Sequence, residues 1–115
     1  MMPFLKISTN KAVNIAAQTK FLQAASKQVA ETLQKPEKFV MTLFDQPTPM
    51  TFGGTDEDTA FLEIKSIGLS NEQAKILAEE IPSLTEKELG INPEKIYIEF
   101  SDAPRSFWGW NKGTF

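Results

Sequence analysis

Two positions could carry chemistry, because each places a distinctive residue at the end of a predicted element. Pro3 lies at the very start of the first predicted strand, and Lys35 stands directly before Pro36, between a predicted helix and the next strand. Both residues also have an ordinary structural explanation. A proline suits the beginning or edge of a strand, and a lysine near a helix C-terminus interacts favourably with the helix dipole. The residues by themselves leave both interpretations open.

The composition removes most other kinds of active site. The 115 residues include no Cys and no His, which excludes disulfides, thiol chemistry and cysteine-ligated metals and deprives a catalytic triad or zinc site of its usual parts. The chain has no P-loop, dinucleotide-binding glycine pattern, HExxH or GxSxG, and Phe52-Gly53-Gly54 is better interpreted as a turn. We therefore expect neither a metal nor a cofactor.

Charge and hydropathy limit the partners. The net charge is −3 and no basic cluster exceeds two residues, whereas nucleic-acid binders carry a basic stripe, so no nucleic-acid partner is expected. No apolar run approaches the roughly 20 residues of a membrane span, and the N-terminus lacks the apolar region of a signal peptide. We expect a single domain over 1–115 in a cytoplasmic protein, with non-classical secretion as an open alternative.

An internal repeat organises the chain. With a shift of 57 residues, Phe4-Leu5-Lys6-Ile7 aligns with Phe61-Leu62-Glu63-Ile64, and Pro36-Glu37-Lys38 aligns with Pro93-Glu94-Lys95. Each aligned block begins a segment in which apolar and polar residues alternate and strand-forming residues are frequent. The half-repeats run from about 3 to 45 and from about 60 to 102; a Pro- and Gly-containing loop joins them, and an aromatic tail, 103–115, follows.

Between the two predicted strands of each copy lies a segment whose apolar residues have helical spacing. The first copy has apolar residues three and four positions apart, namely Phe21, Leu22, Ala25, Val29 and Leu33. In the second copy Ser70 and Gln73 form a predicted capping box, and Gly90 is a predicted C-terminal stop. Each half is therefore a predicted βαβ unit with parallel strands. Together they predict an α+β fold, a four-stranded mixed sheet with two helices on one face.

Strand alternation predicts which side chains face the helices. These are Leu5, Ile7, Phe39, Met41, Leu43, Leu62, Ile64, Ile96, Ile98 and Phe100. The opposite face would be mixed and polar, with Thr42 and Val40 on it. A helix layer on one side only leaves apolar residues and sheet edges uncovered, which favours oligomerisation. The four aromatic residues of the tail favour docking on a neighbouring subunit or in a pocket.

Short motifs in a characteristic order carry a family resemblance. They are Met2-Pro3-Phe4, Thr9-Asn10, Lys35-Pro36, Met50-Thr51-Phe52-Gly53-Gly54, Ser66-Ile67-Gly68, Pro93-Glu94-Lys95-Ile96-Tyr97-Ile98, Gly109-Trp110-Asn111 and Thr114-Phe115. From end to end the chain resembles the macrophage migration inhibitory factor family of the tautomerase superfamily. The resemblance implies a symmetric homotrimer with three active sites at subunit interfaces.

The resemblance also implies a reaction and its residues. After removal of the preceding Met, the bared nitrogen of Pro3 would be the general base in keto–enol tautomerisation of aryl 2-keto acids such as phenylpyruvate. Lys35 would lower the pKa of that amine and hold the substrate carboxylate. The remaining substrate-binding positions would be the backbone at Ile67, Tyr97 from the adjacent subunit, and an aromatic wall of Phe39, Trp110 and Phe115.

Two departures from the family pattern leave two functions open. Glu99 stands where the best-known members have Asn, and a carboxylate there would raise the pKa of the proline amine and repel an anionic substrate. The start Met1-Met2-Pro3 would keep Pro3 an amide unless both Met residues are absent from the mature chain. The first function is the tautomerase. The alternative is a signalling or binding protein of this family with weak or vestigial tautomerase activity.

Overall fold

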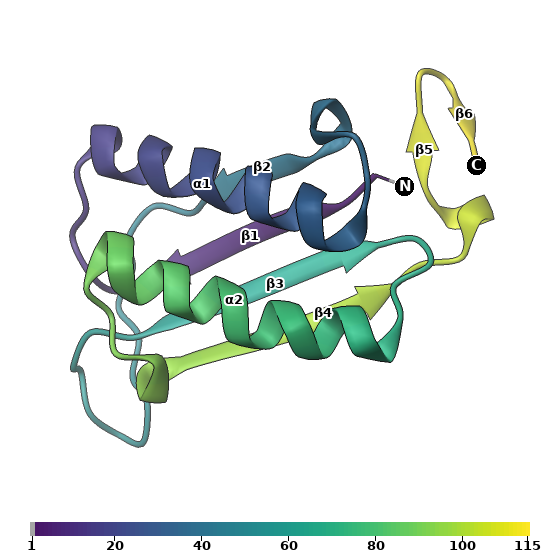
Figure 1. Cartoon of the computed structure of the whole chain (residues 1–115). Helices are drawn as coiled ribbons and strands as arrows, with labels where there is room; N and C mark the ends of the chain where they lie inside the picture. The colour runs from purple at the N-terminus through teal and green to yellow at the C-terminus, as the bar shows by residue number, and fades with distance from the viewer. Residues whose placement is uncertain (1) are drawn as a thin grey trace.

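A mixed four-stranded sheet carries both helices on one face (Figure 1). This computed structural model describes residues 2–115. The main elements are β1 (Phe4–Thr9), α1 (Ile15–Leu33), β2 (Met41–Phe44), β3 (Ala60–Ser66), α2 (Asn71–Leu89) and β4 (Ile96–Asp102). The strand order is β2-β1-β3-β4, with β1 parallel to β2, β3 parallel to β4 and β1 antiparallel to β3. The predicted pair of βαβ units in one mixed sheet is confirmed.

Short elements complete the chain. Three single 3-10 turns and a small C-terminal hairpin are present: η1 (Glu37–Phe39), η2 (Pro93–Lys95), η3 (Arg105–Phe107), β5 (Gly109–Trp110) and β6 (Gly113–Thr114). The hairpin lies beside the N-terminal end of the chain in Figure 1. None of the helices within residues 2–115 has both the length and the apolar character needed to cross a membrane.

Local signals set the helix ends. Ser70 and Gln73 form the predicted reciprocal capping box of α2, and Gly90 ends that helix at a φ of 71°, a conformation that costs glycine little. The Lys11 ammonium donates to the Leu89 carbonyl at 2.6 Å and satisfies one of the last carbonyls of α2. Helix α1 begins at the Asn14 cap, whose side chain accepts from the Ala17 N–H at 2.8 Å.

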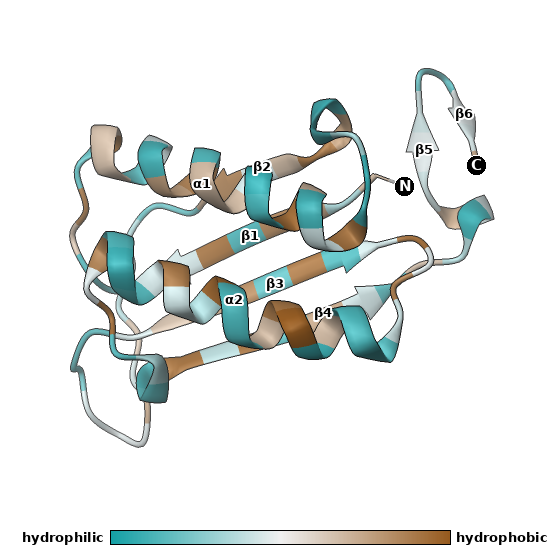
Figure 2. Cartoon of the chain, in the orientation of Figure 1, coloured by the Kyte–Doolittle hydropathy of each residue, from teal (hydrophilic) through white to brown (hydrophobic). Residues whose placement is uncertain are grey.

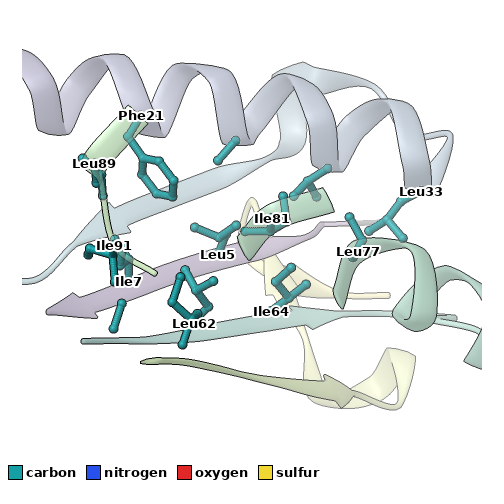
Figure 3. Close-up of a cluster of buried hydrophobic side chains, with 14 residues drawn as sticks. Leu5, Ile7, Phe21, Leu33, Leu62, Ile64, Leu77, Ile81, Leu89 and Ile91 are labelled. Carbon is teal, nitrogen blue, oxygen red and sulfur yellow. The ribbon is translucent and has the colours of Figure 1, made fainter. Parts of the chain in front are cut away.

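The core lies between the sheet and the helices. Alternating brown and teal along the strands in Figure 2 marks the change of face from one residue to the next. Figure 3 shows the buried side chains of both helices meeting those of β1 and β3. The fully buried large residues include Leu5, Ile7, Phe21, Leu62, Ile64, Leu77, Ile81 and Ile91. Burial of such side chains supplies the main stabilisation of the fold.

The predicted orientation of β2 is wrong by one residue. Met41 pairs with Phe4 and lies 37 positions after it, whereas Tyr97 pairs with Phe61 and lies 36 positions after it. Because the two βαβ units differ by one residue, the constant shift of 57 assigned the opposite parity to the second strand of the first unit. Met41 and Leu43 therefore face away from the helices, at 65% and 39% exposure.

Three further predictions for this segment, at Phe39, Val40 and Thr42, are also wrong. Val40 and Phe44, and not Phe39, pack against the core, and Thr42 shares the parity of Leu5, which faces the helices. Phe39 lies in η1 before β2 begins. The predicted orientations of Ile96, Ile98 and Phe100 on β4 are confirmed, since all three are in or against the core.

Asn10 orders the long connection between the two units. Its side-chain N–H groups donate to the carbonyls of Met50 (3.2 Å), Asp56 (3.3 Å) and Glu57 (3.0 Å). Its side-chain oxygen accepts from the Thr59 N–H at 2.9 Å. One amide thus replaces the regular backbone pairing that this loop lacks.

The corrected register of β2 predicts unequal effects of two neighbouring substitutions. Phe44→Ala should lower the free energy of unfolding by about 2 to 3 kcal/mol, because the ring packs against the core and meets Phe21 edge to face at 6.3 Å. Leu43→Ala should cost less than about 1 kcal/mol. Urea denaturation would measure both at a dilution where every variant has the mass of a single chain, because Leu43 lies on the uncovered sheet face. Equal losses would contradict the register.

Removal of the Asn10 amide should loosen the loop. Asn10→Ala is expected to cost about 1 to 3 kcal/mol, since four loop groups lose a partner. Limited proteolysis should then cut within 46–58 faster than in the parent. Asn71→Ala, at the exposed start of α2, is the control and should leave the cleavage rate unchanged. An equally resistant loop in Asn10→Ala would show that other contacts hold it.

Candidate active site

Pro3 occupies a fixed, buried position directly before β1. Its carbonyl accepts a hydrogen bond from the Met41 N–H at 3.0 Å, which extends the β1–β2 ladder to the proline. A proline can hold this place because the pairing uses its carbonyl and needs no N–H. The nitrogen is therefore held at the end of the sheet where β1 begins.

A cavity of about 460 Å³ opens at Pro3. Its lining residues are Met2, Pro3, Phe4, Phe39, Met41, Lys65, Phe107, Trp108, Gly109 and Trp110. Five of these are aromatic and Lys65 is the one charged residue among them. The volume and the apolar lining are typical of small-molecule sites, which use few polar groups to orient a ligand.

The C-terminal tail supplies much of the aromatic lining. The Trp110 ring meets Phe39 edge to face at 5.5 Å and stacks on Phe115 at 6.4 Å. The tail is held in a closed loop, because the Phe115 N–H donates to the Trp108 carbonyl at 3.2 Å and Arg105 Nε donates to the Phe115 carbonyl at 3.4 Å. The three predicted wall residues therefore form one connected aromatic group beside Pro3.

Lys35 lies at the same end of the sheet but lines a different cavity. Helix α1 ends through Gln34, a left-handed residue at φ 55°, and the Lys35 N–H closes the turn on the Ala30 carbonyl at 2.9 Å. The ammonium then reaches β3 and donates to the Ile67 carbonyl at 2.6 Å and to Ser66 Oγ at 3.1 Å. Its half-buried position and fixed partners make Lys35 a well-oriented charge.

The cavity at Lys35 has a volume of about 600 Å³ and includes Ile67 and Arg105. Asp102, at the end of β4, shapes its floor: one carboxylate oxygen accepts from the N–H groups of Gly68 (2.8 Å) and Leu69 (3.2 Å). The loop after β3 is thus fastened to β4, with Gly68 at a φ of 75°. The predicted pair Lys35 and Ile67 is brought together here.

Tyr97 and Glu99 lie away from both cavities within one chain. Tyr97 pairs with Phe61, which itself lies opposite Ser8 near the far end of β1 from Pro3. The Tyr97 ring is 65% exposed and 4.9 Å from the Phe52 ring. Glu99 is exposed and pairs with Glu63. A single chain therefore does not bring these two residues to Pro3.

Sequence reasoning missed the cavity role of Lys65 and the Ser66 contact with Lys35. Lys65 reaches the Pro3 cavity because it pairs with Phe4 across the antiparallel β1–β3 ladder. The alternation of the strand could have shown that Lys65 and Ser66 point to opposite faces. It could not show which β1 residue lies opposite Lys65, since that register depends on the packed sheet.

The arrangement offers three chemical capabilities at one end of the sheet. An aromatic cavity can bind an aryl group, the two lysines can bind anions, and Pro3 is positioned where a free amine would contact a bound ligand. Within residues 2–115, no group of three or more His, Cys, Asp or Glu side chains is placed to hold a metal ion.

Comparison with known proteins gives one consistent result. The family model "Macrophage migration inhibitory factor (MIF)" matches residues 2–115. A macrophage migration inhibitory factor homolog of Brugia malayi is 36% identical over 115 residues, 99% of each chain.

Solved structures agree with the sequence match. The crystal structure of a homologue from Prochlorococcus marinus superposes with a TM-score of 0.91 at 40% identity, covering 97% of this chain and 98% of that one. The protein from Toxoplasma gondii gives a TM-score of 0.92 at 31% identity, covering 97% and 99%. With its doubled βαβ sheet and a match over nearly its whole length, the chain belongs to the macrophage migration inhibitory factor family of the tautomerase superfamily.

Proposed function

We propose that this protein is a keto–enol tautomerase of aryl 2-keto acids such as phenylpyruvate, with the free nitrogen of Pro3 as the general base. The observation that carries the proposal is the burial of Pro3 in a cavity whose lining is aromatic except for Met2, Met41, Gly109 and one lysine. An aryl ring suits such a wall, and the anionic end of a keto acid suits a nearby ammonium.

The reaction moves one proton and changes no oxidation state. The Pro3 nitrogen removes a proton from the carbon between the carbonyl group and the aryl ring, and the C–H electrons form the C=C bond of an enolate. The enolate oxygen then takes up a proton and becomes the enol hydroxyl. Ketonisation is the reverse. The base must be neutral near pH 7, and both apolar burial and a nearby cation lower the pKa of a secondary amine.

Lys35 is the proposed holder of the substrate carboxylate. An ammonium has three N–H donors, and the Ile67 carbonyl and Ser66 hydroxyl use two of them. The third is free for the substrate carboxylate. The Ile67 backbone contributes to the same region, and Phe39, Trp110 and Phe115 hold the ring.

We propose a homotrimer in which a neighbouring chain completes each site. Tyr97 and Glu99 lie on β4, separated from β1 by β3, and do not line the Pro3 cavity of their own chain, so we place them at Pro3 of a neighbouring chain. The uncovered sheet face supports the assembly, since Met41, Leu43 and Tyr97 expose large apolar surfaces on it. Tyr97 would donate a hydrogen bond to the substrate, and Glu99 would weaken the binding of an anion.

The alternative is a signalling or binding protein of this family with weak tautomerase activity. It is favoured by the structure of the Pro3 cavity when Met2 is present: the Met2 side chain lines the cavity, and the Pro3 nitrogen is then an amide without a basic lone pair. In that form the fold and the surface remain, and the base is lost.

The base is tested by changing only the Pro3 nitrogen. A chain that starts at Pro3 should ketonise enol phenylpyruvate, followed by the loss of enol absorbance. Pro3→Gly and the same chain with Met2 retained should both lose at least about 100-fold in kcat/KM, the typical contribution of a general base. Thr19→Ala, an exposed change on α1 away from the cavity and from Tyr97, is the control. Undiminished turnover by the Met2 form would refute the mechanism and favour the alternative.

The assembly is tested by mass. Light scattering at micromolar concentration should give three times the 12.9 kDa chain mass. Mixing inactive Pro3→Gly chains with inactive Tyr97→Phe chains should restore some turnover, because mixed trimers contain sites with an intact Pro3 and an intact neighbouring Tyr97. A monomeric mass, or no restoration after the chains have exchanged, would contradict sites shared between subunits.

A further inference from the structure

Lys65 is a cation of the Pro3 cavity that the mechanism above does not use. It lies on the face of β3 away from the helices, whereas the adjacent Ser66 is buried toward them and contacts Lys35. Its partners across the sheet are Phe4 on β1 and Ser101 on β4, neither of which is charged. The two lysines thus approach the Pro3 end of the sheet from opposite faces.

Its charge is uncompensated within the part of the chain that the structure describes. The neighbouring lysine on this face, Lys6, has two carboxylate partners, Asp45 at 3.3 Å and Glu63 at 3.8 Å. Lys65 has no ion pair there, and the other lining residues of its cavity are uncharged. In the proposed trimer, the carboxylate expected to compete with a ligand for Lys65 is Glu99 of the neighbouring chain. An unpaired ammonium beside aromatic walls attracts an anion more strongly than one in open water.

We propose that Lys65 binds a second anionic group of the ligand, so that the site prefers aromatic acids with two negative charges over those with one. This deepens and rests on the proposed function. The 2-keto carboxylate is held at Lys35, the ring lies against the aromatic wall, and an acidic substituent on the ring reaches Lys65. The substrate class is therefore an aryl 2-keto acid that carries a further carboxylate.

The structure provides an optical signal for this test that needs no catalysis. The chain has two tryptophans, Trp108 and Trp110, and both line the Pro3 cavity. Quenching of their fluorescence reports ligand entry directly. Phenylacetate and 4-carboxyphenylacetate suit the purpose, because they share the ring, differ by one carboxylate and have no ketone to turn over.

The parent protein should bind the dianion about tenfold more tightly than the monoanion, as expected for one additional charge-assisted hydrogen bond. Lys65→Gln should reduce this ratio to near one, mainly by weakening the dianion, and Lys65→Arg should keep most of it. Lys27→Gln removes the same charge from an exposed position on α1 and should leave the ratio unchanged. The preference should also weaken in high salt.

An unchanged ratio in Lys65→Gln would overturn the proposal, as would an equal fall in Lys27→Gln or a parent protein without any preference. The outcome of this binding test is independent of the test of Pro3 as the general base. If Pro3→Gly turns over phenylpyruvate normally while Lys65→Gln loses the dianion preference, the tautomerase mechanism fails and the anion site stands. If Pro3 is essential and the ratio does not change, the mechanism stands and Lys65 has no role in binding.

Discussion

The antiparallel ladder between β1 and β3 is the constraint on which the rest of the molecule depends. It joins two βαβ units at the centre of one sheet, and its register places Phe4 opposite Lys65. The beginning of β1 therefore meets the end of β3. For this reason one end of the sheet brings together three segments that are distant in the sequence: Pro3, the loop after Ser66 and the end of β4.

Helix α1 and the C-terminal tail reach the Pro3 end of the sheet through their own local structure. The left-handed Gln34 ends α1 so that the Lys35 ammonium returns to the Ile67 carbonyl. The tail turns back after β4 and sets Trp110 against Phe39. Each connection is short and hydrogen-bonded, and together they hold a defined cavity in a small chain.

The division of the site between two cavities gives the two lysines different environments. Lys35 is held by two oxygen acceptors, so its charge is oriented and partly satisfied. Lys65 is exposed and has no carboxylate opposite it. The residues expected from a neighbouring chain, Tyr97 and Glu99, lie on β4 and do not line the Pro3 cavity of their own chain. The catalytic proposal therefore depends on an assembly, whereas the aromatic cavity is already present in one chain.

The sequence alone determined the two βαβ units, the ends of α2 and the helix-facing residues of β1, β3 and β4, because these depend on local signals: the spacing of apolar residues, the Ser70 cap and the Gly90 stop. It also determined the family, through motifs in a fixed order. Only the tertiary structure decided the parity of β2, the partner of Lys65 and the separation of the Pro3 and Lys35 cavities. A one-residue difference between the repeats reverses every side chain of a strand, and local patterns cannot detect it when both faces carry apolar residues.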